Sequence, residues 1–228
     1  DNETEFNLRT CAFAKEHSIP LLIGKITRED VKRWKEAGID ALICCGYYYR
    51  IPVDEKLPMV NIHPALLPKG RGAWPMPVTL LEGLRESGIT IHKMTDDFDE
   101  GDILSQKAVP VMPEDTLQTL TARLQTLLPG MMAELASDFC HLYEMARPQG
   151  EGEYWPCPEE SNYPVTPDMD VSEADRILRA FYGYECIYRN RDEIYGVMEG
   201  RAYPAVYGGE KGLPVRGGTI VARRVRKL

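Results

Sequence analysis

The chain has 228 residues, of which 43% are hydrophobic, so it can bury a sizeable core in one large domain with a small one beside it. Its formal net charge of −8 and its pI of about 5.2 argue against a broad nucleic-acid interface, which requires a basic face. No apolar run approaches the roughly 20 residues of a membrane span and no segment has the form of a signal peptide, so we expect a cytoplasmic protein without a membrane partner.

The first half of the chain alternates helix-like and strand-like segments. Helical spacing of apolar residues predicts a helix over 6–17, and a second over 28–37 carries acidic residues in its first turn. A third helix is expected over 76–84. Short apolar runs predict strands over 19–23, 40–45, 60–63, 89–94 and 103–109. Strands that alternate with helices predict a parallel or mixed sheet covered on both faces, the Rossmann-like α/β arrangement.

A long helix is predicted from Glu114 onward, because leucines at positions 117, 120, 124, 127 and 128 form a stripe along one face. Pro129 and Gly130 should kink this helix or briefly interrupt it. We expect the leucine stripe to pack into the core rather than to bind a partner.

The composition changes to Pro, Gly, Glu and aromatic residues around 147–168, which indicates a linker draped over the first domain. Ser172 to Asp175 then has the form of a capping box. The helix that follows should bury Ala174, Ile177, Leu178 and Phe181. From Tyr184 onward the sequence is β-like, with its clearest strand over 219–225. We therefore expect a catalytic domain (1–146), a linker (147–168) and a small C-terminal helix-plus-β domain (169–228).

Two further features receive a structural interpretation. Basic residues gather at 223–227, and we expect a solvated terminal strand there rather than a binding patch. The six cysteines show no Cys-x-x-Cys spacing, and two of them are adjacent in an apolar run. We therefore expect buried free thiols in a reducing compartment and no metal centre.

An amide, an imidazole and a carboxylate recur between Asn61 and Leu104. In an extended strand, Asn61 and His63 point to the same side, so both can face one cleft. Asp99 follows after one predicted helix and one predicted strand, at the mouth of an adjacent strand. Acyl transfer uses such a set: the amide donates to a developing oxyanion and the ring moves a proton. The carboxylate orients the ring, favours its charged form or takes the proton through water.

Each of these residues also has a structural interpretation. A histidine after a strand is more often structural than catalytic, asparagine at a strand end is usually a turn residue, and Asp99 could form a turn with Glu100 and Gly101. Their joint order and spacing favours the catalytic interpretation. We expect His92 to be a satisfied core residue or to line the cleft from behind, while His17 and His141 lie on predicted helices.

A family resemblance is carried by these residues together with the loop Leu66-Leu67-Pro68-Lys69-Gly70-Arg71-Gly72 and the run Asp99-Glu100-Gly101-Asp102. The pattern resembles the 10-formyltetrahydrofolate-dependent formyltransferases. That resemblance implies 10-formyltetrahydrofolate as co-substrate and Asn61, His63 and Asp99 as catalytic residues. It also implies that backbone groups in two loops hold the pterin ring, namely at Tyr48, Tyr49, Arg50 and Ile51 and at Thr95, Asp96 and Asp97. For any one tyrosine, a half-buried turn is an equal alternative.

The resemblance also bears on the acceptor. It places Lys69 and Arg71 near the acceptor, where Arg71 would grip phosphate; the alternative is that Arg71 pins its own loop against an acidic neighbour. The loop 69–75 resembles the methionyl-tRNA and sugar branches more than the purine-pathway branch. Tyr48-Tyr49-Arg50 resembles the branch that formylates amino sugars on nucleotides, such as 4-amino-4-deoxy-arabinose on UDP. The expected partner is therefore a small-molecule amine, a nucleotide-linked amino sugar, and the oligomeric state stays open.

Three alternatives remain beside this expectation. Methionyl-tRNA formyltransferase would need a basic surface and a full β-barrel after the linker. A formyltetrahydrofolate deformylase would resemble the purine-pathway loop, and a non-catalytic folate-binding module would have no use for an intact Asn61, His63 and Asp99. Family members normally begin with a further strand, helix and strand, so we expect the native chain to be longer than the 228 residues.

Overall fold

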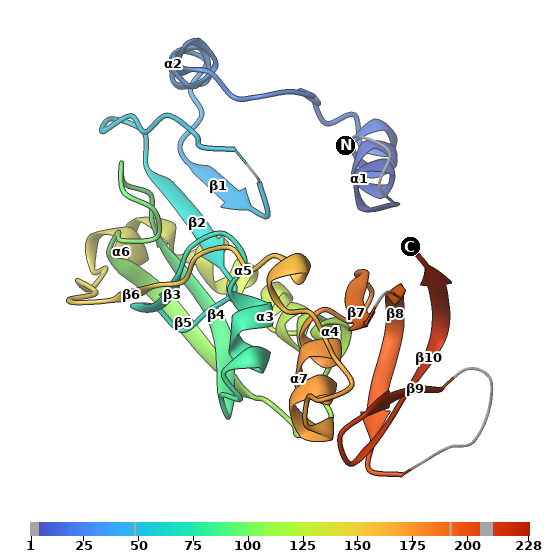
Figure 1. Cartoon of the computed structure of the whole chain (residues 1–228). Coiled ribbons are helices and arrows are strands. Elements are labelled where there is room, and N and C mark those ends of the chain that lie inside the picture. The colour runs from blue at the N-terminus through green and yellow to red at the C-terminus, as the bar shows by residue number, and fades with distance from the viewer. Residues whose placement is uncertain (1–4, 48, 192, 206–211) are drawn as a thin grey trace.

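The computed structural model describes residues 5–47, 49–191, 193–205 and 212–228, which form two larger β-sheets (Figure 1). The first sheet has the order β1-β2-β4-β5 and consists of β1 (Leu42–Cys45), β2 (Met59–His63), β4 (Glu86–Lys93) and β5 (Ile103–Pro110). β1 pairs with β2 in parallel, and the other two pairs are antiparallel. This mixed sheet confirms the predicted Rossmann-like α/β class.

Helices follow the predicted pattern through this first domain. They are α1 (Glu5–Glu16), α2 (Arg28–Glu36), α3 (Pro75–Leu81), α4 (Leu117–Gln125), α5 (Leu128–Ser137) and α6 (Phe139–Glu144). α2 begins where the Thr27 hydroxyl oxygen accepts a hydrogen bond from Asp30 N and the Asp30 carboxylate accepts one from Thr27 N. α3 begins at Pro75. Proline has no N–H group, and at the first position of a helix that group would have no partner within the helix, so proline is well tolerated there.

The helix predicted from Glu114 is interrupted as expected, although one turn earlier than Pro129. α4 ends at Gln125 and α5 restarts at Leu128, so Pro129 lies in the first turn of a new helix, which tolerates proline. Leu117, Leu120 and Leu124 are buried, which confirms the core-facing stripe.

The predicted strand over 19–23 is wrong. The structure has no β-strand there, and Ile19, Leu21, Leu22 and Ile23 are about half exposed. An apolar run becomes a strand only when a neighbour takes up its backbone hydrogen bonds, and within the described ranges no strand pairs with this segment. Figure 1 shows α1 and this segment standing apart from the sheet.

The C-terminal part contains one helix and an antiparallel sheet, as predicted. α7 (Val171–Ala180) precedes β7 (Cys186–Asn190), β8 (Glu193–Tyr203), β9 (Gly212–Val215) and β10 (Gly218–Lys227), in the sheet order β7-β8-β10-β9. The basic residues of β10 are paired rather than free: Arg224 contacts Glu199, Arg226 contacts Glu185 and Lys227 contacts Glu193. These pairs support the interpretation of 223–227 as an ordinary surface strand.

The predicted capping box at Ser172 is wrong. The N-cap of α7 is Asp170, whose carboxylate accepts a hydrogen bond from Ser172 N at 2.9 Å. Asp175 instead accepts hydrogen bonds from Arg179 and Arg201, and Arg179 donates to the backbone oxygen of Asp115 in the first domain. The carboxylate therefore serves a network between the two domains and is not available to cap the helix.

The two domains share one hydrophobic core. Ala174, Ile177, Leu178 and Phe181 are buried as predicted, and they belong to the same cluster as Leu80, Leu120 and Ile91 of the first domain. Figure 1 shows α7 lying beside α3. The C-terminal domain is therefore held in a fixed position against the first sheet, which matters because it contributes to the cavity described below.

The predicted linker is built into the first domain. β6 (Glu153–Tyr154) pairs in parallel with β3 (Lys69–Arg71), and Arg147 exchanges both backbone hydrogen bonds with Ile103. The 3-10 helix η1 (Glu160–Asn162) follows before the chain reaches α7. This segment lies directly over the loop that follows β2.

The cysteines are free thiols, but the expectation that they are buried holds for few of them. Cys44 and Cys186 are buried, whereas Cys45, Cys140 and Cys157 are exposed. Within the described ranges, the helices are all too short or too polar to span a lipid bilayer. No cluster of three or more His, Cys, Asp or Glu side chains in those ranges has a geometry that would hold a metal ion.

Candidate active site

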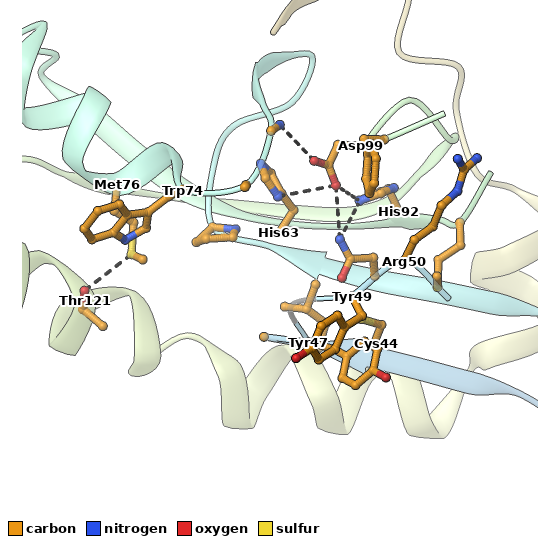
Figure 2. Close-up of a pocket in the computed structure, with 18 of the residues that line it drawn as sticks. Cys44, Tyr47, Tyr49, Arg50, His63, Trp74, Met76, His92, Asp99 and Thr121 are labelled. Atoms are coloured by element: carbon orange, nitrogen blue, oxygen red, sulfur yellow. Dashed lines mark hydrogen bonds and ion pairs between the residues drawn. The ribbon is translucent and has the colours of Figure 1, made fainter. Parts of the chain in front are cut away.

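Asn61, His63 and Asp99 meet at one end of the catalytic sheet. Alternate residues of β2 face opposite sides, and Val60 and Ile62 enter the shared core, so Asn61 and His63 point together away from it. Asp99 follows β4 in a turn, and its Oδ1 lies 3.2 Å from Asn61 Nδ2 and 3.5 Å from His63 Nδ1. The structure therefore brings the three predicted catalytic side chains into contact (Figure 2).

His63 is buried and held in one tautomer. Its Nε2 lies 2.7 Å from the carbonyl oxygen of Gly70, which can only accept, so Nε2 carries the proton. The neutral ring then presents the lone pair of Nδ1 towards Asp99. Burial lowers the pKa of His63 below its usual value, and the charge of Asp99 and the bond to Gly70 oppose this only in part. Asp99 thus acts in the expected direction, but burial outweighs it.

Asp99 is a buried carboxylate in an unusual backbone conformation. Its φ of 58° is in the left-handed region, which Asp tolerates better than most residues. Burial would raise the pKa of Asp99, but the hydrogen bond with His92, the nearby charge of His63 and the N–H of Gly72 together hold that pKa below its usual value. Gly72 N donates to Asp99 Oδ2 at 3.0 Å. Asp99 is therefore an anion at neutral pH.

His92 belongs to this site, which the sequence suggested only weakly. Its Nε2 lies 3.3 Å from both Asn61 Nδ2 and Asp99 Oδ1, and its Nδ1 lies 2.8 Å from the carbonyl oxygen of Lys93. The neutral ring accepts from the amide of Asn61, and a protonated ring would donate to Asp99. The antiparallel register pairs Asn61 directly with His92, so a correct strand pairing would have revealed this contact.

Arg71 does not line the cavity described below and pins its own loop. Its guanidinium is almost fully buried, 3.1 Å from Glu100 Oε1, and it donates two hydrogen bonds to Gln149 Oε1. Lys69 is exposed, 3.9 Å from Glu153, and its ammonium lies over the Trp155 ring. Neither side chain lines the cavity described below, so the structure gives no support to placing the acceptor beside them.

Gln149 connects this loop to the turn that carries Asp99. Its amide Nε2 donates to the backbone oxygen of Asp99 at 2.8 Å and to that of Gly101 at 2.6 Å, while its Oε1 accepts from Arg71. The turn that carries Asp99 is therefore anchored by a residue from the predicted linker. Sequence inspection missed Gln149, because a contact across 50 positions leaves no local pattern.

These residues open onto a cavity of about 830 Å³ that extends to either side of His63 (Figure 2). At one end, two loops supply the residues predicted to hold the pterin: Tyr49, Arg50, Ile51, Thr95, Asp96 and Asp97 all line it, together with Tyr47, Met94 and Phe98. Tyr48 lies outside the described residues. Arg50 joins the loops by donating to the backbone oxygen of Asp96 and by lying 5.6 Å from the Phe98 ring centroid.

The other end of the cavity was not predicted. Trp74 and Met76 lie there, beside residues from α4 and from the turn after α7, including Thr121, Tyr182 and Tyr184. Thr121 Oγ1 lies 3.4 Å from the sulfur of Met76. The C-terminal domain therefore contributes to the wall of the same cavity as the catalytic residues.

Comparison with known proteins shows which family this region resembles. Residues 24–135 match the family model described as formyl transferase. The chain is 31% identical over 166 residues to methionyl-tRNA formyltransferase from Ehrlichia ruminantium (strain Welgevonden), covering 71% of this chain and 54% of that protein. It thus spans about half the length of this curated relative.

Solved structures share the fold at lower identity. HypX from Aquifex aeolicus in complex with tetrahydrofolic acid matches with a TM-score of 0.68 and 16% identity, over 86% of this chain and 37% of that chain. A 4-N formyltransferase from Francisella tularensis matches with a TM-score of 0.65 and 20% identity, over 99% of this chain and 86% of that one. Both likenesses agree with the architecture of the catalytic domain and of the sheet that follows it.

Proposed function

We propose that this chain, whose residues 24–135 match the formyl transferase family model, is a member of that family and transfers a formyl group from 10-formyltetrahydrofolate to a primary amine. The observation that carries the proposal is the contact of Asn61, His63 and Asp99 within one cavity. An amide donor, a neutral imidazole and a buried carboxylate are the groups that acyl transfer to an amine uses.

One end of the cavity suits the folate co-substrate, which would supply the one-carbon acyl group. Ile51, Met94 and Phe98 offer apolar surface for a planar ring, and the two loops around them offer backbone donors and acceptors. We assign Tyr49, Arg50, Ile51, Thr95, Asp96 and Asp97 to this role, and Tyr48 on sequence grounds alone. Tetrahydrofolate is bound in HypX, which shares this fold.

His63 is the group that we expect to take the proton from the attacking amine. Its lowered pKa keeps the ring neutral at neutral pH, and the bond from Nε2 to Gly70 leaves Nδ1 free to accept. Once Nδ1 is protonated, Asp99 Oδ1 lies 3.5 Å away and stabilises the new charge. Asp99 itself remains ionised, because its pKa is lowered.

Asn61 is the neutral donor for negative charge that develops on the formyl oxygen. Its Nδ2 lies at 3.2 Å from Asp99 and 3.3 Å from His92, both long contacts. One of its two hydrogens can therefore leave His92 for a better acceptor at little cost. The contact with Asp99 Oδ1 would still fix the orientation of the amide.

The acceptor that we propose is a small amine, a nucleotide-linked amino sugar. The chain is acidic overall, and the basic residues of β10 are paired with Glu199, Glu185 and Glu193. A tRNA acceptor stem would require basic groups that remain available to phosphates.

The second candidate is methionyl-tRNA formyltransferase, which is favoured by the curated relatives. The Ehrlichia ruminantium protein is 31% identical, and the relative from Treponema denticola is 27% identical over 82% of this chain. Salt dependence separates the two acceptors. Activity on tRNA would fall steeply between low and moderate salt because many phosphates are neutralised together, whereas activity on a sugar would change little.

An acceptor panel tests the proposal. The protein is incubated with 10-formyltetrahydrofolate and, separately, with UDP-4-amino-4-deoxy-arabinose, initiator methionyl-tRNA or buffer, and release of tetrahydrofolate is followed. Release that depends on the amino sugar supports the proposal. Release with tRNA alone supports the second candidate, and release in buffer would show hydrolysis instead of transfer.

A further inference from the structure

The cavity has an aromatic end that the proposed chemistry leaves unexplained. Trp74, Tyr182 and Tyr184, called the aromatic wall below, line it beyond His63. Figure 2 shows Trp74 on one side of His63, and Arg50 with the predicted pterin loops on the other. The catalytic histidine therefore lies between two binding surfaces, as a transfer between two bound molecules requires.

The aromatic wall is assembled by both domains. Trp74 lies two residues after Gly72, whose N–H donates a hydrogen bond to Asp99, so the position of Trp74 is linked to that of Asp99. It packs at 4.9 Å from the ring of Tyr184 and at 6.0 Å from that of buried Phe181. Tyr182 and Tyr184 follow α7 directly, and Tyr184 is 47% exposed. Contacts from both sides thus fix the Trp74 ring while Tyr184 stays accessible to a ligand.

The charges around the cavity limit what this end can bind. Among the described residues that line the cavity, Arg50 is the single Lys or Arg, and it lies at the pterin end beside Asp96. The polar side chains that α4 contributes to the cavity are neutral: Gln118, Thr121 and Gln125. A phosphate would find no cationic partner there, whereas amides and a hydroxyl suit the hydroxyl groups of a sugar.

We propose that the aromatic wall binds the sugar ring that carries the reactive amine, with an apolar face of that ring against Trp74 and Tyr184. The proposal rests on formyl transfer as the function of this site. Aromatic faces attract apolar and positively polarised groups, and the α4 amides can bond the hydroxyls at the ring edge. The nucleotide diphosphate of such an acceptor would then project out of the cavity rather than bind within it.

Two substitutions test the aromatic wall. Tyr184→Leu should raise the KM for UDP-4-amino-4-deoxy-arabinose about three- to tenfold, the scale of a lost aromatic contact. Trp74→Leu should raise it at least as much, although this variant also loses packing against Phe181. Neither change should alter the shift in melting temperature that tetrahydrofolate produces. Tyr203→Leu is the matched control, since Tyr203 is a similarly exposed tyrosine of the C-terminal domain that does not line the cavity.

Competition separates the sugar from the nucleotide. The methyl glycoside of the same amino sugar should inhibit, or accept the formyl group itself, and lose affinity in Tyr184→Leu; UDP alone should compete weakly and equally with both proteins. An acceptor KM that is unchanged in Tyr184→Leu, or competition by UDP but not by the glycoside, would overturn the assignment and leave formyl transfer intact. If wild-type protein formylates only tRNA or no acceptor at all, the sugar assignment fails together with the proposed acceptor.

Discussion

Replacing Gln149 with alanine should loosen the turn that holds Asp99. The side chain donates to the backbone oxygens of Asp99 and Gly101 and accepts twice from Arg71. Hydrogen bonds contribute about 1 kcal/mol each, and water replaces part of them at a half-buried site, so the unfolding free energy should fall by about 2 kcal/mol.

The catalytic effect follows from the backbone of Asp99. Its left-handed conformation, with φ at 58°, costs about 1–2 kcal/mol, and the hydrogen bonds from Gln149 help to maintain it. Without the hydrogen bonds from Gln149, the backbone of Asp99 can relax to an unstrained conformation. A difference of that size lowers the fraction of molecules with Asp99 in the left-handed conformation roughly tenfold, and kcat should fall by about the same factor. The acceptor KM should change little, because Gln149 does not line the cavity.

Two variants isolate this effect, with kcat measured by tetrahydrofolate release and stability by denaturant unfolding. Gln149→Glu keeps an acceptor for Arg71 but loses both donors, so it should lose kcat with a smaller loss of stability. Gln106→Ala removes a glutamine that donates to Leu67 O and to Thr90 rather than to the Asp99 turn, and it should keep its kcat. The reasoning is refuted if both Gln149 variants match Gln106→Ala in kcat.

Further predictions concern the same site. His63→Ala and Asp99→Ala should each lower turnover at least about a hundredfold, and the double variant should be little worse, because the two residues act as one unit; near-normal turnover in His63→Ala would rule out this proton acceptor. Because burial lowers the pKa of His63, the unfolded chain binds more protons than the folded one below about pH 6.5. The free energy of unfolding should therefore rise with pH up to that value and level off above it. Denaturant unfolding at several pH values should show a weaker pH dependence of this free energy for His63→Gln. The charge of Asp99 raises the pKa of His63 against the effect of burial, so the acid limb of the activity profile should move to lower pH in Asp99→Asn; an unmoved limb would mean that Asp99 acts on the amine or on water. Gly72→Ala should lower the melting temperature by several degrees, because φ is 121° there and a Cβ would lie 2.2 Å from the backbone oxygen of Trp155. An unchanged melting temperature would show that the backbone at Trp155 can move away from β3 at little cost in free energy. Arg71→Lys should reduce stability and kcat while leaving the acceptor KM unchanged, which is opposite to the outcome for a phosphate-binding arginine.

Local sequence patterns were enough to predict most elements and to place two of the three proposed catalytic residues on one face of a strand. Period-two alternation in β2 placed Asn61 and His63 on one face, and the leucine stripe placed α4 in the core, because both depend on neighbours a few positions away. The segment 19–23 shows the limit of this approach. Its apolar composition is strand-like, but strand formation depends on a partner that composition does not report.

Contacts between segments that are distant in the sequence could not be predicted from local patterns. Gln149 reaches Asp99 across 50 positions, and Tyr184 reaches Trp74 from the other domain. Arg71 had two open interpretations, and its burial against Glu100 and Gln149 supports the structural one. The apolar strand of His92 predicts a core residue or one that lines the cleft from behind; its register opposite Asn61 reveals its contact with the site.

The most direct test of formyl transfer follows the formyl carbon itself. Wild-type protein is incubated with 10-formyltetrahydrofolate labelled at the formyl carbon, together with UDP-4-amino-4-deoxy-arabinose, and products are identified by mass spectrometry. We predict labelled N-formyl sugar nucleotide and unlabelled tetrahydrofolate in equal amounts, with neither formed by His63→Ala. Label that appears as free formate, or an acceptor that stays unlabelled while tetrahydrofolate is released, would contradict transfer to the amine.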